Sequence, residues 1–240
     1  MLRRKISSKL CKRSCDIKMK LVPYGGGWTD VYFDICGDSH CFIISSVLGY
    51  QFSDFLRILY HLHPNHGDSE KADDIIEYKC GLCAKDKNGY HVVRVLNQLQ
   101  DAEPPFVYQD IPWKAQFTWN EEGAQSNWTL ERIPNQAEEF TLKIHIVHER
   151  SEVKIYDYEV PYKDLCYAVA KACTDMLKEY GFYGYHHSTY TQDLNIRHLL
   201  FLKSVALDNY DARKLTYYEE KGHGETTSLK KELELLLFDM

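Results

Sequence analysis

The sequence contains no apolar run close to the ~20 residues that a membrane-spanning helix needs, so we expect no integral membrane protein. It also has no basic excess, because 29 Lys and Arg residues stand against 35 Asp and Glu residues, for a net charge of −6. Nucleic-acid-binding proteins usually carry a basic excess on one face, so we expect no nucleic-acid partner. A basic protein is the better electrostatic complement of this chain.

The amino-terminal segment lacks the apolar core of a secretion signal, and residues 1–15 include basic residues and serines but no acidic residue. We interpret residues 1–18 as a basic leader, with Met19 opening the folded domain. The composition of this segment also resembles a mitochondrial presequence. Because no secretion signal is found, the 8 cysteines are expected to be reduced thiols in a cytoplasmic protein.

Alternation of apolar and polar residues predicts β-strands in two parts of the chain. Residues 28–35 alternate, and a Gly-Asp-Ser turn leads to a second apolar segment at 41–47, which predicts a hairpin. Four more strands follow one another at short spacing, which favours an antiparallel meander. They are expected at 113–119, 127–133, 140–147 and 153–160. The third of them should turn Leu142 and its alternate neighbours toward a helix.

Helical periodicity predicts helices at 52–62, 162–180 and 195–207, with Gly181 and Asp193 as capping residues. We therefore expect an α+β fold with a mostly antiparallel sheet, a hairpin plus a meander, flanked by helices. The domain should span residues 19–208, with an insertion at 64–112. A charged tail at 209–240 should carry a short amphipathic helix, whose apolar stripe consists of Leu229, Leu233, Leu236 and Leu237.

An aromatic hairpin with an acidic turn stands at the start of the predicted meander. Its residues are Phe117, Trp119, Glu121, Glu122, Gly123, Trp128, Leu130 and Arg132. The order of hairpin, helix and aromatic hairpin resembles uncharacterised small bacterial α+β proteins, including some that resemble immunity proteins of toxin systems. The resemblance covers about residues 20–62 and 113–160. It implies a protein-binding, toxin-neutralising function and supplies no catalytic residues.

Two segments are candidates for a protein-binding surface. The acidic turn should expose Glu121 and Glu122, which could steer a basic partner. The segment GYHHSTY at 184–190 and the residues just before it offer aromatic contact area at low entropic cost. Its candidate contact residues are Tyr183, Tyr185, His186 and Tyr190. A structural loop between two helices is the alternative interpretation of this segment.

Catalysis is not predicted at a particular residue. Ser188 follows two histidines but lacks the glycines of a nucleophile elbow. The segment YGGGWTD at 24–30 does not open a helix as a phosphate-binding loop does, because a strand follows it. The alternative to a protein-binding module is therefore a hydrolase or nuclease that uses scattered histidines and acidic residues.

A zinc site is a further possibility, since Cys80 and Cys83 have the spacing of one metal-binding knuckle. One pair of thiolates supplies half of a tetrahedral site. His63 and His66, with His61 beside them, are the nearest candidates for the rest, and Cys36 with Cys41 is another pair. No second knuckle is present, so a zinc-stabilised scaffold remains an alternative, and no other cofactor is expected.

Overall fold

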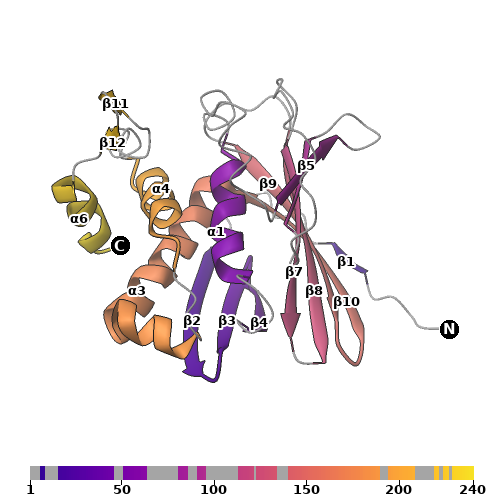
Figure 1. Cartoon of the computed structure of the whole chain (residues 1–240). Helices are drawn as coiled ribbons and strands as arrows, with labels where there is room; N and C mark the ends of the chain where they lie inside the picture. Colours follow the sequence, from indigo (N-terminus) through magenta and orange to yellow (C-terminus); the bar gives the residue numbers. More distant parts are fainter. Residues whose placement is uncertain are drawn as a thin grey trace.

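A seven-stranded sheet, a three-stranded sheet, a small two-stranded hairpin and a group of helices make up the described part of the fold in this computed structural model (Figure 1). The structure describes residues 6–8, 16–45, 51–63, 81–85, 91–95, 113–121, 123–133, 140–189, 194–208, 219–221, 224–226 and 229–240. The arrangement is the α+β fold with mostly antiparallel sheets that the sequence predicts.

The larger sheet has seven strands in the order β1-β10-β9-β8-β7-β6-β5. Its centre is the predicted antiparallel meander of β7 (Trp113–Glu121), β8 (Ala124–Arg132), β9 (Thr141–Glu149) and β10 (Val153–Pro161). The hairpin of β5 (Gly81–Lys85) and β6 (His91–Val95) extends one edge, and β6 pairs parallel with β7. At the other edge, β1 (Ile6–Ser8) pairs parallel with β10.

The meander buries one face, as its period-2 pattern predicts. Leu142 is fully buried, which confirms the predicted register, because a shift by one residue would turn it to solvent. Phe140 stacks on Tyr162 at the start of the following helix, with ring centroids 4.4 Å apart. The other buried residues of this face include Ala115, Phe117, Trp119, Trp128, Leu130, Ile144 and Ile146.

The smaller sheet consists of β2 (Ile17–Gly25), β3 (Trp28–Ile35) and β4 (Asp38–Ser45), with β3 in the middle. The predicted hairpin is the β3–β4 pair. Strand β2 was not predicted, although its inner residues Ile17 and Leu21 are buried and alternate with exposed lysines. The two sheets meet where Phe42 contacts Trp128, with ring centroids 5.1 Å apart.

Helix α1 (Gln51–His61) lies in front of the junction of the two sheets, and α3 (Tyr162–Ser188) and α4 (Ile196–Ala206) lie farther from the large sheet (Figure 1). Phe55 of α1 is fully buried and contacts Phe117 and Trp119, with ring centroids 5.4 Å away in both cases. Helix α4 begins at a different cap than predicted, because the side chain of Asn195 accepts the hydrogen bond from the His198 backbone N–H. Asp193 lies outside the described residues.

Helix α6 (Leu229–Leu237) packs beside α4 and ends near the carboxyl terminus of the chain, beyond the small hairpin of β11 (Glu219–Lys221) and β12 (Gly224–Thr226). Of the predicted apolar stripe, Leu236 alone is partly buried and packs against the core. Leu235 is the buried residue and packs on Leu200. Leu229, Leu233 and Leu237 instead face solvent.

Two segments that the sequence sets apart from the domain contain strands. The leader expected at 1–18 includes β1 and the first residues of β2, and the insertion expected at 64–112 includes β5 and β6, which belong to the large sheet. Among the residues that the structure describes, no helix is long and apolar enough to cross a membrane.

The prediction that every cysteine is a reduced thiol is wrong at Cys36, which is disulfide-bonded. Cys41, Cys166 and Cys173 are not disulfide-bonded, and the last two are buried in the core as expected. Disulfides persist in oxidising surroundings, so the cytoplasmic expectation loses the support that reduced cysteines gave it.

Candidate functional site

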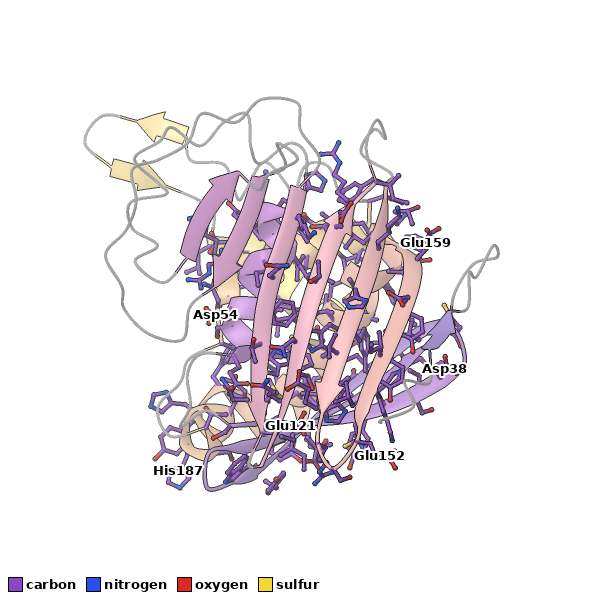
Figure 2. The ribbon with its side chains drawn as sticks, turned by 90° about the vertical axis from the view of Figure 1, so that its right-hand side faces the viewer. Asp38, Asp54, Glu121, Glu152, Glu159 and His187 are labelled. Carbon is purple, nitrogen blue, oxygen red and sulfur yellow. The ribbon has the colours of Figure 1, made fainter. Side chains whose placement is uncertain are left out.

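Exposed aromatic residues lie on two segments that are joined to each other, the last turns of α3 and the end of β2 beside the β2–β3 turn. Tyr183 is 81% exposed, Tyr24 is 55% exposed and Phe182 is 51% exposed. His187 is also exposed, and its ring stacks on Tyr183 at a centroid distance of 6.2 Å and an interplanar angle of 7°. We call these four residues the Tyr183 patch. Figure 2 labels His187 at the end of the molecule that carries this patch.

The local sequence explains why the patch is presented at this point. Gly181 interrupts α3 with a φ of 67°, a left-handed conformation that favours glycine. The chain then continues in helical turns through Ser188, so the expected loop is helical over most of its length. The last turn is closed by Thr189, whose backbone N–H and hydroxyl both donate to the Tyr185 carbonyl, at 2.9 and 2.8 Å.

A glycine turn fixes the strand side of the Tyr183 patch. Gly26 and Gly27 both have positive φ, as the central residues of two-residue hairpin turns require. The Gly27 N–H donates to the Ser188 carbonyl at 3.0 Å, which joins this turn to the end of α3. The turn connects two antiparallel strands, so its glycines serve a hairpin.

Beside the patch, side chains on the outer face of the smaller sheet are exposed to solvent. Tyr32 is 45% exposed, and its hydroxyl donates to the Asp30 carboxylate at 3.2 Å. The negative charge of Asp30, together with this hydrogen bond, raises the pKa of Tyr32. The phenol therefore stays protonated near neutral pH. Lys18, Lys20 and Asp34 lie exposed on the same face, so the surface next to the patch is polar and of mixed charge.

The structure separates the residues that the sequence grouped as contact residues. Tyr183 is exposed as expected, His186 is half-buried, and Tyr185 is buried at 5% exposure, which rules it out as a contact residue of the folded chain. Tyr190 lies outside the described residues. Sequence reasoning missed Phe182 and Tyr24, and the available signals for turns there were Gly181 before Phe182 and the glycines after Tyr24.

The expectation of an exposed carboxylate at Glu121 is wrong. Glu121 is only 6% exposed, and it accepts a hydrogen bond from the Ser126 hydroxyl at 2.9 Å. Its Oε1 also lies 3.4 Å from His148 Nε2. Glu121 falls on the buried face of β7 because the alternation that buries Trp119 continues to it. Glu122 lies outside the described residues.

This buried trio does not have the order of a catalytic triad. In such a triad the histidine lies between the serine and the acid, so that it can take the hydroxyl proton. Here the carboxylate of Glu121 lies between Ser126 and His148. Ser126 is fully buried, so a substrate cannot reach its hydroxyl. The trio is a polar network at one end of the inner face of the sheet.

A second polar network links the two sheets. His40 Nε2 lies 2.7 Å from the Tyr158 hydroxyl, which in turn donates to Asp38 at 3.4 Å. Burial lowers the pKa of His40 and raises the pKa of Tyr158, so both rings are neutral near pH 7. His40 also contacts the edge of Tyr156, with centroids 4.5 Å apart. Figure 2 shows Asp38 on the opposite side of the view from His187, so this network is separate from the Tyr183 patch.

The residues proposed for zinc are not brought together in the part that is described. His63 is 2% exposed and lies among the rings of Phe140, Tyr162 and Phe201. Cys83 is placed in β5 by its backbone alone, and Cys80 and His66 lie outside the described residues. No group of three or more His, Cys, Asp or Glu side chains that could hold a metal is found among the residues searched.

Comparison with known proteins gives no match: no family model matches the chain, and neither a curated protein nor a solved structure does.

Proposed function

We propose that this chain is a protein-binding module and that it binds its partner through the Tyr183 patch. The observation that supports this is that Tyr24, Phe182 and Tyr183 are each more than half exposed and lie on a hairpin and a helix that a backbone hydrogen bond joins. Exposed apolar patches of this kind commonly mark interaction sites. Tyrosine is among the residues that contribute most to binding when it becomes buried.

The backbone and two side chains of the Tyr183 patch are already held in place, which also suits binding. The Gly27 to Ser188 hydrogen bond and the Thr189 cap hold the backbone on both sides of it, so little order has to be created when a partner binds. Tyr183 and His187 already stack on each other, which restricts both side chains. The polar tips of these rings can satisfy hydrogen bonds across an interface while their bodies supply apolar area.

A more specific version of the proposal is that the partner is a basic protein, such as a toxin that the chain neutralises. The net charge of −6 supports a basic partner through long-range attraction. Burial of Glu121 removes one member of the acidic turn from that argument. The open face around Asp30 and Asp34 is the acidic surface nearest to the patch, although Lys18 lies on it as well.

The alternative of a hydrolase or nuclease has less support. Ser188 is half-buried, and the His187 ring stacks on Tyr183. Ser126 of the Glu121 network is fully buried in the core. Neither of these two serines is therefore an exposed hydroxyl beside a free base.

Site-specific photo-crosslinking in the source cells tests the proposal. A photoreactive residue at position 183 should capture one defined protein, whereas the same residue at position 167 should not. Tyr167 is a matched control because it is also on α3 and is 40% exposed. Capture of the same proteins at both positions, or at neither, would contradict binding through the patch.

Affinity measurements with the purified captured protein complete the test. Truncation of a central aromatic contact commonly costs at least 2 kcal/mol, so the double variant Phe182→Ala, Tyr183→Ala should weaken binding by about thirtyfold. Tyr167→Ala should leave the dissociation constant within about twofold. An unchanged dissociation constant for the double variant would remove the patch from the interface. Dissociation at higher salt would support the basic-partner version specifically.

A further inference from the structure

Helix α6 presents a second apolar surface, distinct from the Tyr183 patch. Leu229, Leu233 and Leu237 are 66%, 44% and 73% exposed. They are spaced four residues apart, so they form one stripe along the helix. Phe238, which is 52% exposed, follows directly. We call these four residues the α6 stripe.

Contacts on the opposite side of α6 keep the α6 stripe facing solvent. Leu235 is buried against Leu200 of α4. Lys203, which is fully buried, donates from Nζ to the carbonyls of Leu236 and Phe238 at 2.9 and 2.8 Å. These bonds neutralise the negative end of the α6 dipole with a positive charge. A rotation that turned the stripe inward would break all of them.

Two more lysines fix the chain end beyond α6. Lys171 of α3 donates to the Met240 carbonyl at 2.8 Å, and Lys178 of α3 forms an ion pair with Asp239. The terminal segment is therefore tied to both α3 and α4. The stripe faces away from the elements that hold the helix, so it is available to a separate body.

We infer that the α6 stripe pairs with the α6 stripe of a second copy of this chain, with the two helices antiparallel across a two-fold axis. A two-fold axis near Leu233 places Leu233 against its own equivalent and Leu229 against Leu237 of the other copy. Such an interface is self-complementary, because each surface supplies both halves of every contact.

The charges beside the stripe suit the antiparallel arrangement. Lys230 and Glu234 lie on one flank, with Lys230 Nζ 3.9 Å from a Glu234 carboxylate oxygen. Antiparallel helices bring the same flanks together in opposite directions, so Lys230 of each copy comes beside Glu234 of the other. A parallel pair would place the same flank of each copy on opposite sides of the interface, so Lys230 would lie away from Glu234 of the other copy, and it would align the two helix dipoles unfavourably. The antiparallel pair is therefore the one that the charges select.

Sedimentation equilibrium of the full chain over a concentration series tests the pairing. The wild-type chain should show a reversible monomer–dimer equilibrium, because four side chains on each copy form a small interface. Leu233→Asp should raise the dimer dissociation constant by about tenfold or more, since it places two like charges at the axis. Tyr167→Asp is the control for an added surface charge and should leave the equilibrium unchanged.

Charge reversal tests the antiparallel direction. Lys230→Glu alone and Glu234→Lys alone should each weaken the dimer by a few-fold, about three- to tenfold for the two symmetric contacts. The double variant Lys230→Glu, Glu234→Lys should restore the wild-type constant. A chain that stays monomeric at every concentration, or a dimer that Leu233→Asp leaves intact, overturns the pairing. Failure of the double variant to restore affinity overturns the antiparallel arrangement.

The test is independent of the proposed function. Phe182→Ala with Tyr183→Ala should leave the dimer unchanged, because those residues belong to a different surface. If this variant abolished the dimer, the Tyr183 patch would be the self-association surface, and the inference about α6 would be wrong.

Discussion

Buried polar groups form different kinds of hydrogen bonds at the junction of the two sheets and on the helical side of the molecule. At the junction, side chains bond to side chains of distant strands, as in the 2.7 Å contact between His40 of β4 and Tyr158 of β10. On the helical side, the fully buried Lys203 bonds to backbone carbonyls at the end of α6. The first arrangement involves neutral rings, whereas the second buries an ammonium group.

This difference indicates what each region holds in place. The His40–Tyr158 contact links residues 118 positions apart in the sequence, so it belongs to the packing of one sheet on the other. The Lys203 bonds hold only the terminal helix. We therefore expect disruption of the junction to lower the stability of the whole domain. Disruption at Lys203 should release α6 first.

The largest effect is expected from Trp128→Ala at the junction. Trp128 is 1% exposed, and its ring lies 4.7 Å from Trp119 and 5.1 Å from Phe42, measured between centroids. Truncation removes these contacts and leaves a cavity, so the free energy of unfolding should fall by about 3–5 kcal/mol. Urea denaturation followed by circular dichroism measures it. A loss below about 1 kcal/mol would show that the junction is not the centre of stability.

The second prediction concerns the pH dependence that Lys203 causes. Burial lowers the pKa of Lys203 from 10.5 to about 8. Between these two values the unfolded chain binds more protons than the folded chain, so the free energy of unfolding should rise with pH. The contribution is up to about 3 kcal/mol across the window, at 1.36 kcal/mol for each pKa unit.

The variant Lys203→Met isolates this contribution. The wild type minus variant difference in the free energy of unfolding should rise between pH 8 and 10.5. Other lysines and tyrosines cancel in this difference. Met leaves the carbonyls of Leu236 and Phe238 without their donor, so hydrogen exchange in α6 should become faster than in α4. A pH-independent difference would mean that the Lys203 ammonium is hydrated in the folded chain.

The sequence predicts the sheet meander well because its signal is local. Phe117 and Trp119 alternate with polar residues, and one buried face is enough to fix the register of such a strand. The same alternation, followed two residues further, would have placed Glu121 on the buried face. Strand β2 was readable in the same way from Ile17 and Leu21 between lysines. The interpretation of residues 1–18 as a leader hides this strand, because Ile17 falls within that segment.

Other features depend on contacts that no local pattern carries. The His40–Tyr158 contact requires knowledge of which strands face each other across two sheets. Leu235 rather than Leu233 is buried because Lys203 and Leu200 decide how α6 is rotated on α4. The Tyr183 patch needs the hydrogen bond from Gly27 to Ser188, which joins two segments that are distant in the sequence.

A third prediction extends the comparison to a buried carboxylate near the sheets. Asp54 of α1 is 8% exposed, and burial raises its pKa from 3.8 to about 6, against the opposing effect of its ion pair with Arg57. The folded chain binds more protons than the unfolded chain between these values. The free energy of unfolding should therefore fall as pH rises from 3.8 to about 6.

Asp54→Asn tests this contribution, which we expect to be about 1–3 kcal/mol. Relative to the wild type, the variant should gain stability as the pH rises through the window, because it has no carboxylate to ionise. Thermal melts at several pH values between 4 and 7 measure the difference. A parallel loss of stability in both proteins would place the pH dependence on other groups.

The smallest effect is expected at the exposed aromatic residues of the Tyr183 patch. Phe182→Ala with Tyr183→Ala removes two rings that are 51% and 81% exposed, so little buried area is lost. The free energy of unfolding should change by no more than about 0.5 kcal/mol, as for most surface substitutions.

Tyr185→Ala is the matched comparison, because this residue is two positions further on the same turn and is buried at 5% exposure. It should cost about 3 kcal/mol or more, the range of large-to-small changes in a core. Similar costs at positions 183 and 185 would mean that Tyr183 packs against the domain, and the patch would then lose its availability for a partner.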